Sequence, residues 1–150
     1  MIIRKANPND ALQIISFQIA LAAETEKLRL DPHVVTLGVN AVFKDPSKGN
    51  YYVAEKNRQL IGSLLTTYEW SDWRNGTVLW IQSVYVLPEF RRKGIYRALY
   101  GHIRELVDNT QELKGIRLYT DKNNKTAQRV YERLGMSDEH YHLFEWLKNE

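Results

Sequence analysis

The fold is decided by VLPEFRRKGIYRALY, residues 86–100. An apolar strand ends at Pro88, a basic turn containing Gly94 follows, and a helical pattern begins directly after the turn. The first turn of a helix leaves several backbone N–H groups unpaired and carries a partial positive charge. Because glycine lets a ligand approach the backbone closely, the stretch predicts a binding site for a phosphate or pyrophosphate group.

Four cationic side chains surround this turn: Arg91, Arg92, Lys93 and Arg97. The alternative is a solvated basic loop, and the apolar strand before it and the amphipathic helix after it argue against that alternative. The stretch is not a Walker loop, because no Gly-Lys-Ser/Thr follows, and it is not a dinucleotide fingerprint, because it has a single glycine.

Outward from this turn, strand and helix patterns alternate along the chain. The expected strands cover residues 2–4, 51–54, 60–68, 78–87, 116–119 and 141–146. The expected helices open at residues 7–10 and at 31–32, the second ending near 45–46, and cover 92–109 and 123–134. The order is strand, helix, helix, three strands, helix, strand, helix, strand, which predicts a mixed α/β fold.

Single residues mark several boundaries. Asn75-Gly76 is a turn signal between two strands, and Gly62 marks a bulge in the strand before it. Gly135 is expected to end the helix 123–134 in a left-handed conformation. Strand 78–87 is apolar on both faces, which predicts a position inside the sheet with neighbours on both sides.

Composition narrows the class of protein. The chain has 150 residues, 43% of them hydrophobic, and a net charge of +3, which predicts one domain over residues 1–150. No cysteine is present, which excludes disulfides, Cys-ligated metals and a thiol nucleophile. The four histidines show no ligand spacing, so we expect no metal. We expect no membrane segment, signal peptide or nucleic-acid motif, and therefore a cytoplasmic protein.

Residues 86–100 resemble the acyl-coenzyme A signature of the GNAT N-acetyltransferase superfamily, Gln/Arg-x-x-Gly-x-Gly/Ala. Arg91, Gly94 and Tyr96 stand at its three marked places, the last where Gly or Ala is usual. The resemblance implies a GNAT-like fold, with a mostly antiparallel central sheet, a splayed strand pair and flanking helices. It also implies acetyl-CoA as acyl donor.

A second stretch, NKTAQRVYERLGM at residues 124–136, resembles the other landmark of the family, with Asn124, Ala127 and Tyr131 in register. In the family this tyrosine protonates the departing coenzyme A thiolate. A phenol of pKa about 10 can do so for a thiol of pKa about 8.5 when the site tunes it. The alternative is that Tyr131 is a core residue of its helix.

The resemblance assigns further residues to the coenzyme. The backbone of the splayed strand pairs with the pantetheine arm, and an amide of that strand polarises the thioester carbonyl as an oxyanion hole does. The implied coenzyme contacts are Val84, Tyr85, Val86, Arg91, Arg92, Lys93, Gly94, Ile95, Tyr96, Arg97, Asn124 and Ala127.

Two acids are candidates for handling the proton of the amine. A lysine-like amine is neutral in only about one molecule in ~2500 at pH 7, so a base helps it to attack. Glu69 and Asp72 are interleaved with Tyr68, Trp70 and Trp73, and together these residues could hold a cation by charge and by aromatic faces. The alternative is that the acids are solvated residues of a hairpin. Gln82 stands where some relatives carry a glutamate base, so the base is Glu69, Asp72 or water.

The acceptor pocket of family members often includes residues after the first helix, which here are Glu24 and Glu26. At this spacing at most one of them points inward, and surface acids are the alternative. The leading hypothesis is direct acetyl transfer to a primary amine of a small molecule, polyamine-like or amino-acid-like. The alternatives are a non-catalytic acyl-CoA-binding module and a protein N-acetyltransferase; a homodimer would fit the family.

Overall fold

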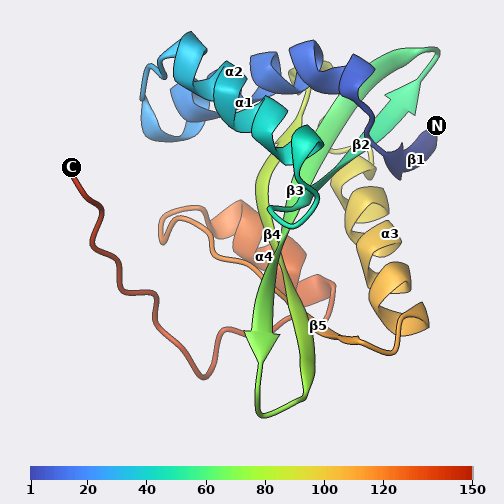
Figure 1. The fold of residues 1–150 in the computed structure, drawn as a ribbon, viewed down its shortest axis with the longest axis vertical. Coiled ribbons are helices and arrows are strands. Elements are labelled where there is room, and N and C mark those ends of the chain that lie inside the picture. Colours follow the sequence, from blue (N-terminus) through green and yellow to red (C-terminus); the bar gives the residue numbers. More distant parts are fainter. Residues whose placement is uncertain (150) are drawn as a thin grey trace. The chain divides into compact units, whose positions relative to one another are not determined.

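The computed structural model describes residues 1–149, which form two compact units, Met1–Arg117 and the residues from Leu118 onward. The first unit contains all five strands and three of the helices (Figure 1). Its elements are β1 (Ile2–Lys5), α1 (Ala11–Glu26), α2 (Pro32–Lys44), β2 (Asn50–Lys56), β3 (Gln59–Ser71), β4 (Gly76–Val86), α3 (Ile95–Asn109) and β5 (Leu113–Arg117). The second unit contains α4 (Lys125–Arg133).

The sheet has the order β1-β2-β3-β4-β5, antiparallel throughout except for the parallel pair β4–β5. This confirms the predicted mixed α/β fold and the predicted interior position of β4, which has a strand on each side. The parallel pair follows from connectivity, because α3 carries the chain from the end of β4 back to the start of β5.

Two adjacent tyrosines show how the helices cover the two faces of the sheet. Tyr51 lies against Phe43 of α2, with ring centroids 5.7 Å apart, and Tyr52 lies against His102 of α3 at 5.5 Å. Successive side chains of a strand point to opposite faces, so α2 covers one face and α3 the other (Figure 1). The largest fully buried side chains are Phe17, Ile14, Ile61, Leu64, Leu99, Ile103 and Val53.

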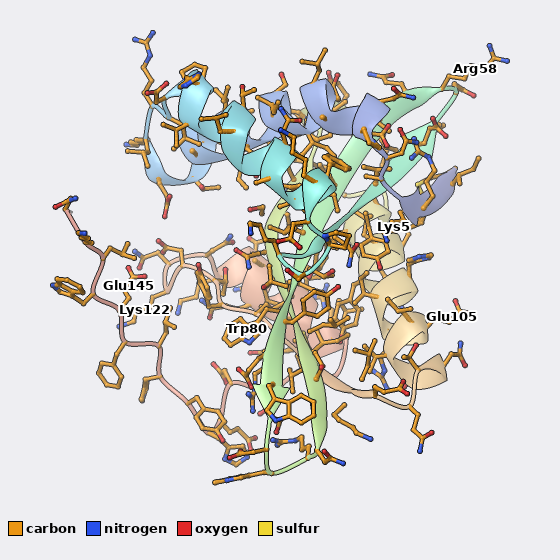
Figure 2. The ribbon with its side chains drawn as sticks, viewed as in Figure 1. Lys5, Arg58, Trp80, Glu105, Lys122 and Glu145 are labelled. Carbon is orange, nitrogen blue, oxygen red and sulfur yellow. The ribbon has the colours of Figure 1, made fainter. Side chains whose placement is uncertain are left out.

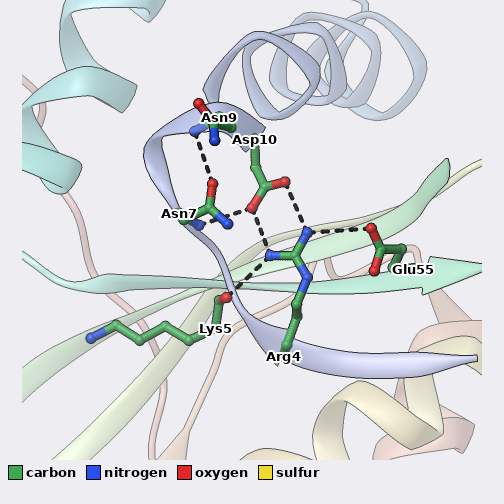
Figure 3. Close-up of polar contacts among 6 residues, drawn as sticks. All are labelled: Arg4, Lys5, Asn7, Asn9, Asp10 and Glu55. Atoms are coloured by element: carbon green, nitrogen blue, oxygen red, sulfur yellow. Dashed lines mark hydrogen bonds and ion pairs between the residues drawn. The ribbon is translucent and has the colours of Figure 1, made fainter. Parts of the chain in front are cut away.

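The entry into α1 is fixed by a small polar cluster (Figure 3). Asn7 accepts a hydrogen bond from the Asn9 N–H at 2.9 Å, and Asp10 accepts one from the Asn7 N–H at 2.8 Å. Arg4 of β1 donates two hydrogen bonds to the Asp10 carboxylate, at 2.8 and 3.0 Å, and lies 3.5 Å from Glu55. The bonds from Arg4 lower the pKa of Asp10, against the opposing effect of burial.

The two helices expected to open at residues 7–10 and at 31–32 are confirmed as α1 and α2. The short 3-10 turn Pro8–Asp10 leads into α1. The third begins at Ile95 rather than at residue 92, because Arg92 and Gly94 are left-handed, at φ of +63° and +82°. The bulge expected at Gly62 occurs one residue earlier, at Ile61. Ala54 faces Gly62 and the next residue, Glu55, faces Leu60, so Ile61 has no partner on β2.

The expected strand at 141–146 is wrong. None of these residues is in a strand, and Tyr141, Phe144 and Trp146 are 74%, 90% and 85% exposed. The alternation of aromatic residues made the segment strand-like, but a strand also needs a neighbouring strand, which the pattern cannot supply.

Candidate functional site

The turn before α3 has the geometry predicted for an anion site. Arg92 and Gly94 both have positive φ, and such a conformation turns successive backbone N–H groups toward one point. Gly94 is the N-cap and no side chain caps the helix, whereas the Ala98 N–H donates to the Gly94 carbonyl at 3.0 Å. Nothing lies within 4 Å of the position a Cβ of Gly94 would take. The N–H groups that precede Ala98 are therefore available to a ligand.

The cations of the turn divide into two groups. Arg92, Lys93 and Arg97 are exposed, and the Lys93 ammonium lies 5.7 Å from the ring centroid of Phe90. Arg91 instead donates from Nε to the Val86 carbonyl at 2.9 Å and from Nη2 to Glu24 at 2.7 Å. Three of the four predicted cations can therefore reach a phosphate, while Arg91 secures the turn to β4 and α1.

The side chains of Ile95 and Tyr96 belong to α3. Ile95 is buried, and its Cγ2 lies 3.4 Å from the position a Cβ of Gly62 would take, so only its amide can serve a ligand. The half-buried Tyr96 ring lies beside Tyr100 at 6.5 Å between centroids. Tyrosine at this marked place of the signature is thus accommodated along the helix.

Glu24 lies in the last turns of α1, not after the helix as expected. It accepts hydrogen bonds from Arg91 and from the Tyr85 hydroxyl, the latter at 3.1 Å. Tyr85 is buried against Phe17, with ring centroids 5.2 Å apart. Burial first, and the bond to Glu24 second, raise the pKa of Tyr85. Glu24 and Glu26 are both exposed, in line with the alternative of surface acids, and Glu24 is held by Arg91 and Tyr85.

β4 separates from β5 along half of its length. The two strands pair from Thr77 to Trp80 only, with a shift of register after Thr77, which leaves the β5 side of residues 81–86 without a strand. On the β3 side of β4, Ser63 faces Tyr85 and Leu65 faces Gln82, so β4 has one more residue than β3 between these two pairs. The extra residue forms a bulge at Ser83, whose φ is +55°. The splayed pair implied by the family resemblance is present, and Val84 lies in the part of β4 that does not pair with β5.

One face of the sheet carries a row of half-buried polar side chains. Gln82 donates from its amide to the Thr67 hydroxyl at 2.8 Å. Further along, Glu69 accepts from the indole N–H of Trp80 at 2.9 Å and from Arg117 (Trp80 is labelled in Figure 2). The Glu69 carboxylate thus ties β3 to both β4 and β5, and both of its oxygens accept hydrogen bonds.

The aromatic cage expected around Glu69 does not form within β3. Side chains alternate between faces along a strand, so Tyr68 and Trp70 lie on the face opposite Glu69. Trp70 is 65% exposed, and Trp73 in the hairpin turn is 87% exposed. Asp72 is in the same turn, and its carboxylate has no hydrogen bond or ion pair within residues 1–149.

In the second unit, Asn124 caps α4 by accepting a hydrogen bond from the Ala127 N–H at 3.1 Å. The two residues assigned to the coenzyme in this stretch therefore form the start of one helix. Tyr131 is half-buried on α4, and Gly135, at φ of +88°, ends the helix as predicted.

Sequence reasoning missed three residues of the site. Ser83 gave no signal, because serine is not a residue type associated with positive φ. Trp80 belongs to a strand whose pattern predicts burial on both faces, and an indole N–H inside such a strand needs a partner. Arg117 was visible as the one charge in a short apolar strand, and this could have marked it as half of an ion pair.

Other kinds of site are not found in the described part of the chain. Within residues 1–149, no group of three or more His, Cys, Asp or Glu side chains is arranged to hold a metal ion. In the same residues, no helix combines the length and apolar character needed to cross a bilayer.

Comparison with known proteins assigns this geometry to a family. The profile of the acetyltransferase (GNAT) family matches residues 17–136, while no curated protein sequence matches. A solved structure of a possible acetyltransferase from Clostridium difficile 630 is 42% identical, with a TM-score of 0.92 over 99% of this chain and 98% of that one.

Two more distant structures share the fold. An aminoglycoside N-acetyltransferase in complex with CoA is 16% identical, with a TM-score of 0.80 over 99% of this chain and 94% of that one. A predicted acetyltransferase with acetyl-CoA from Clostridium acetobutylicum is 20% identical, with a TM-score of 0.75 over 99% and 95%. The chain belongs to the GNAT family: it is an N-acetyltransferase and takes acetyl-CoA as its acetyl donor.

Proposed function

We propose that the protein transfers an acetyl group from acetyl-CoA directly to the primary amine of a small molecule. The observation that carries the proposal is the turn at 91–94, an uncapped helix N-terminus with two left-handed residues and open space beside Gly94. This turn fits the diphosphate of the coenzyme, because convergent amides and the helix dipole both favour an anion. Arg92, Lys93 and Arg97 would add charge attraction.

The unpaired edge of β4 supports the position of the pantetheine arm. Residues 81–86 have no strand on the β5 side, so backbone groups near Val84 can pair with the amides of the arm. The Val86 carbonyl already accepts from Arg91, and Tyr85 pairs with Ser63 of β3, so we assign the pairing with the arm to Val84.

When bound, acetyl-CoA supplies a thioester carbonyl for the amine to attack and a thiol as leaving group. We assign to the β4 backbone the N–H that stabilises charge on the carbonyl oxygen. Tyr131 is assigned the proton donation to the departing thiolate, on the strength of its place in the second family landmark. With no cysteine in the chain, the transfer proceeds without an acyl-thiol intermediate on the protein.

The proton of the amine needs an acceptor on the polar face of the sheet. Glu69 can take it only by displacing Trp80 or Arg117, because both of its oxygens are engaged. Asp72 lies at the far end of β4, which at ~3.4 Å per residue puts about 35 Å of strand between it and the turn. We therefore propose a water on the row of Gln82, Thr67 and Glu69 as the first acceptor.

The paired acids also bear on the kind of acceptor. Arg91 neutralises Glu24 and Arg117 neutralises Glu69, so neither of these two candidate acids offers an uncompensated charge to a dication. This favours an amino-acid-like amine over the polyamine class. The half-buried row of Gln82, Thr67 and Glu69 suits a compact polar acceptor.

Coenzyme A release, followed with a thiol reagent, tests the function against a panel of amino acids, polyamines, aminoglycosides and peptides. Amine-dependent release with an amino-acid-like compound supports the proposal. Coenzyme A binding by calorimetry without release for any amine would instead favour the non-catalytic acyl-CoA-binding alternative. The expected cytoplasmic location and homodimer stay predictions, to be tested by cell fractionation and light scattering.

A further inference from the structure

Three parts of the first unit meet at the Glu24 carboxylate. Its Oε1 accepts from the hydroxyl of Tyr85 at the end of β4, at 3.1 Å, and its Oε2 accepts from Nη2 of Arg91 in the turn, at 2.7 Å. The Arg91 guanidinium also lies 5.4 Å from the centroid of the Tyr85 ring. We call these three residues, Glu24, Tyr85 and Arg91, the α1–turn latch.

The latch has a rigid base. Tyr85 is 5% exposed and packs on Phe17, a fully buried residue of α1. Its hydroxyl is therefore fixed in space and donates to Glu24 from a constant position. A second anchor is the Val86 carbonyl, which accepts from Nε of Arg91 at 2.9 Å. Arg91 is thus held by a carboxylate, a carbonyl and an aromatic face at once.

The turn beside the latch needs such support. Arg92 has a φ of +63°, a conformation that L-residues other than glycine adopt at a cost and keep only where the surroundings impose it. Arg92 follows Arg91 directly, so a fixed Arg91 restrains the backbone of Arg92 and, beyond it, of Gly94. The amides that would meet the diphosphate belong to this same stretch.

The charges at Glu24 argue against a direct role in binding a cationic acceptor. Its negative charge is balanced by Arg91, at a side-chain exposure of 39% for Glu24 and 44% for Arg91. A solvent-exposed ion pair of this kind contributes modestly to stability by itself. The contact between Glu24 and Arg91 therefore matters mainly because it holds the Arg91 side chain in one position.

We propose that Glu24 is a positioning residue for the donor site: it orients Arg91, and through Arg91 it keeps the turn at 91–94 in the conformation that binds the coenzyme. This rests on the proposed function, in which the turn receives the diphosphate. Glu24 acts through Arg91 and touches neither the thioester nor the amine.

The test is calorimetric titration of the full chain with coenzyme A, which requires no knowledge of the acceptor. Glu24→Ala is expected to weaken binding by about five- to tenfold, equal to about 1–1.4 kcal/mol. Glu26→Ala is the matched control, an exposed acid two residues away on the same helix, and should bind like the wild type. Glu24→Gln keeps the shape and one acceptor oxygen, and should bind with an intermediate affinity.

A double-mutant cycle tests the route through Arg91. If Glu24 acts by orienting Arg91, the Glu24→Ala and Arg91→Ala double variant should bind no more than about twofold weaker than Arg91→Ala alone. Additive losses would overturn the route. Thermal unfolding without coenzyme separates affinity from stability; a lower Tm with unchanged affinity in Glu24→Ala would overturn the proposal in favour of a structural role.

The outcomes separate the two proposals. A wild-type chain that does not bind coenzyme A refutes the proposed function and this inference with it. A wild-type chain that binds, with Glu24→Ala binding equally well, refutes the inference alone. A higher KM for the amine in Glu24→Ala, with unchanged coenzyme affinity, would make Glu24 an acceptor contact and also overturn it.

Discussion

Gly94 offers the sharpest perturbation of the coenzyme site. Its φ is +82°, and a Cβ at this position would have no neighbouring atom within 4 Å. In the protein without coenzyme, the effect of Gly94→Val on stability therefore comes from backbone conformation. Holding a residue other than glycine in the left-handed region costs about 1–2 kcal/mol, and a β-branched residue lies at the upper end.

The cost of the left-handed conformation lowers either the stability of the protein or its affinity for coenzyme A. If the turn keeps its shape, stability falls by that amount, and Tm drops by about 2–8 °C for a chain of this size. If the turn relaxes to negative φ, its amides rotate and coenzyme A binds about 5- to 30-fold more weakly. Calorimetric titration and thermal unfolding of the same samples measure both, and the two losses should sum to the predicted range.

Two control variants identify the cause. Gly94→Asn adds a side chain of similar size, but Asn tolerates the left-handed region, so it should stay within a few-fold of wild-type affinity. Gly101→Ala, at an open position inside α3 without positive φ, should stabilise the chain by about 0.5–1 kcal/mol and leave affinity unchanged. Equal affinity and Tm for Gly94→Val and wild type would refute the reasoning.

Three further predictions concern other parts of the chain. Tyr131→Phe should slow acetyl transfer by ~100-fold or more at unchanged coenzyme affinity, and unchanged thiol release would remove Tyr131 from the catalytic residues. Glu69→Gln should lower kcat by less than about tenfold, because Glu69 orients rather than accepts the proton, and Asp72→Asn should leave kcat unchanged; a ~100-fold loss in either would make that acid the base. The pKa of Asp10 is lowered by Arg4, so the stabilisation it provides is present above its ordinary pKa of 3.8 and is lost as the pH falls through its lowered value. Urea unfolding should therefore show Asp10→Ala destabilised by about 2 kcal/mol at pH 7 and by clearly less near pH 2; an equal loss at both would contradict the ion-pair account.

Local signals predicted much of the fold and the donor site. Asn7-Pro8 and Asp31-Pro32 set the starts of two helices, because capping residues act on the backbone next to them. Gly135 marked the left-handed end of α4, and Gly94 marked the turn before α3, although its left-handed conformation was not predicted. The turn before α3 was predicted for the same reason, since its chemistry lies within seven consecutive residues.

The contacts that the sequence did not reveal are long-range ones. Glu24 and Arg91 are 67 residues apart, and Glu69 and Arg117 are 48 apart, so no spacing rule connects either pair. Each acid was interpreted as a candidate for binding an amine, and each is paired with an arginine. Tyr68 and Trp70 were placed in one cage with Glu69, although the alternation of side chains along a strand forbids it.

The central claim is that the amides of residues 92–97 bind the diphosphate of the coenzyme. Amide NMR spectra of the full chain, recorded while coenzyme A is added, measure this directly. We expect the largest shifts at these six N–H groups, with smaller ones near Val84. Saturable binding of coenzyme A that leaves the amides of 92–97 unshifted would contradict the claim.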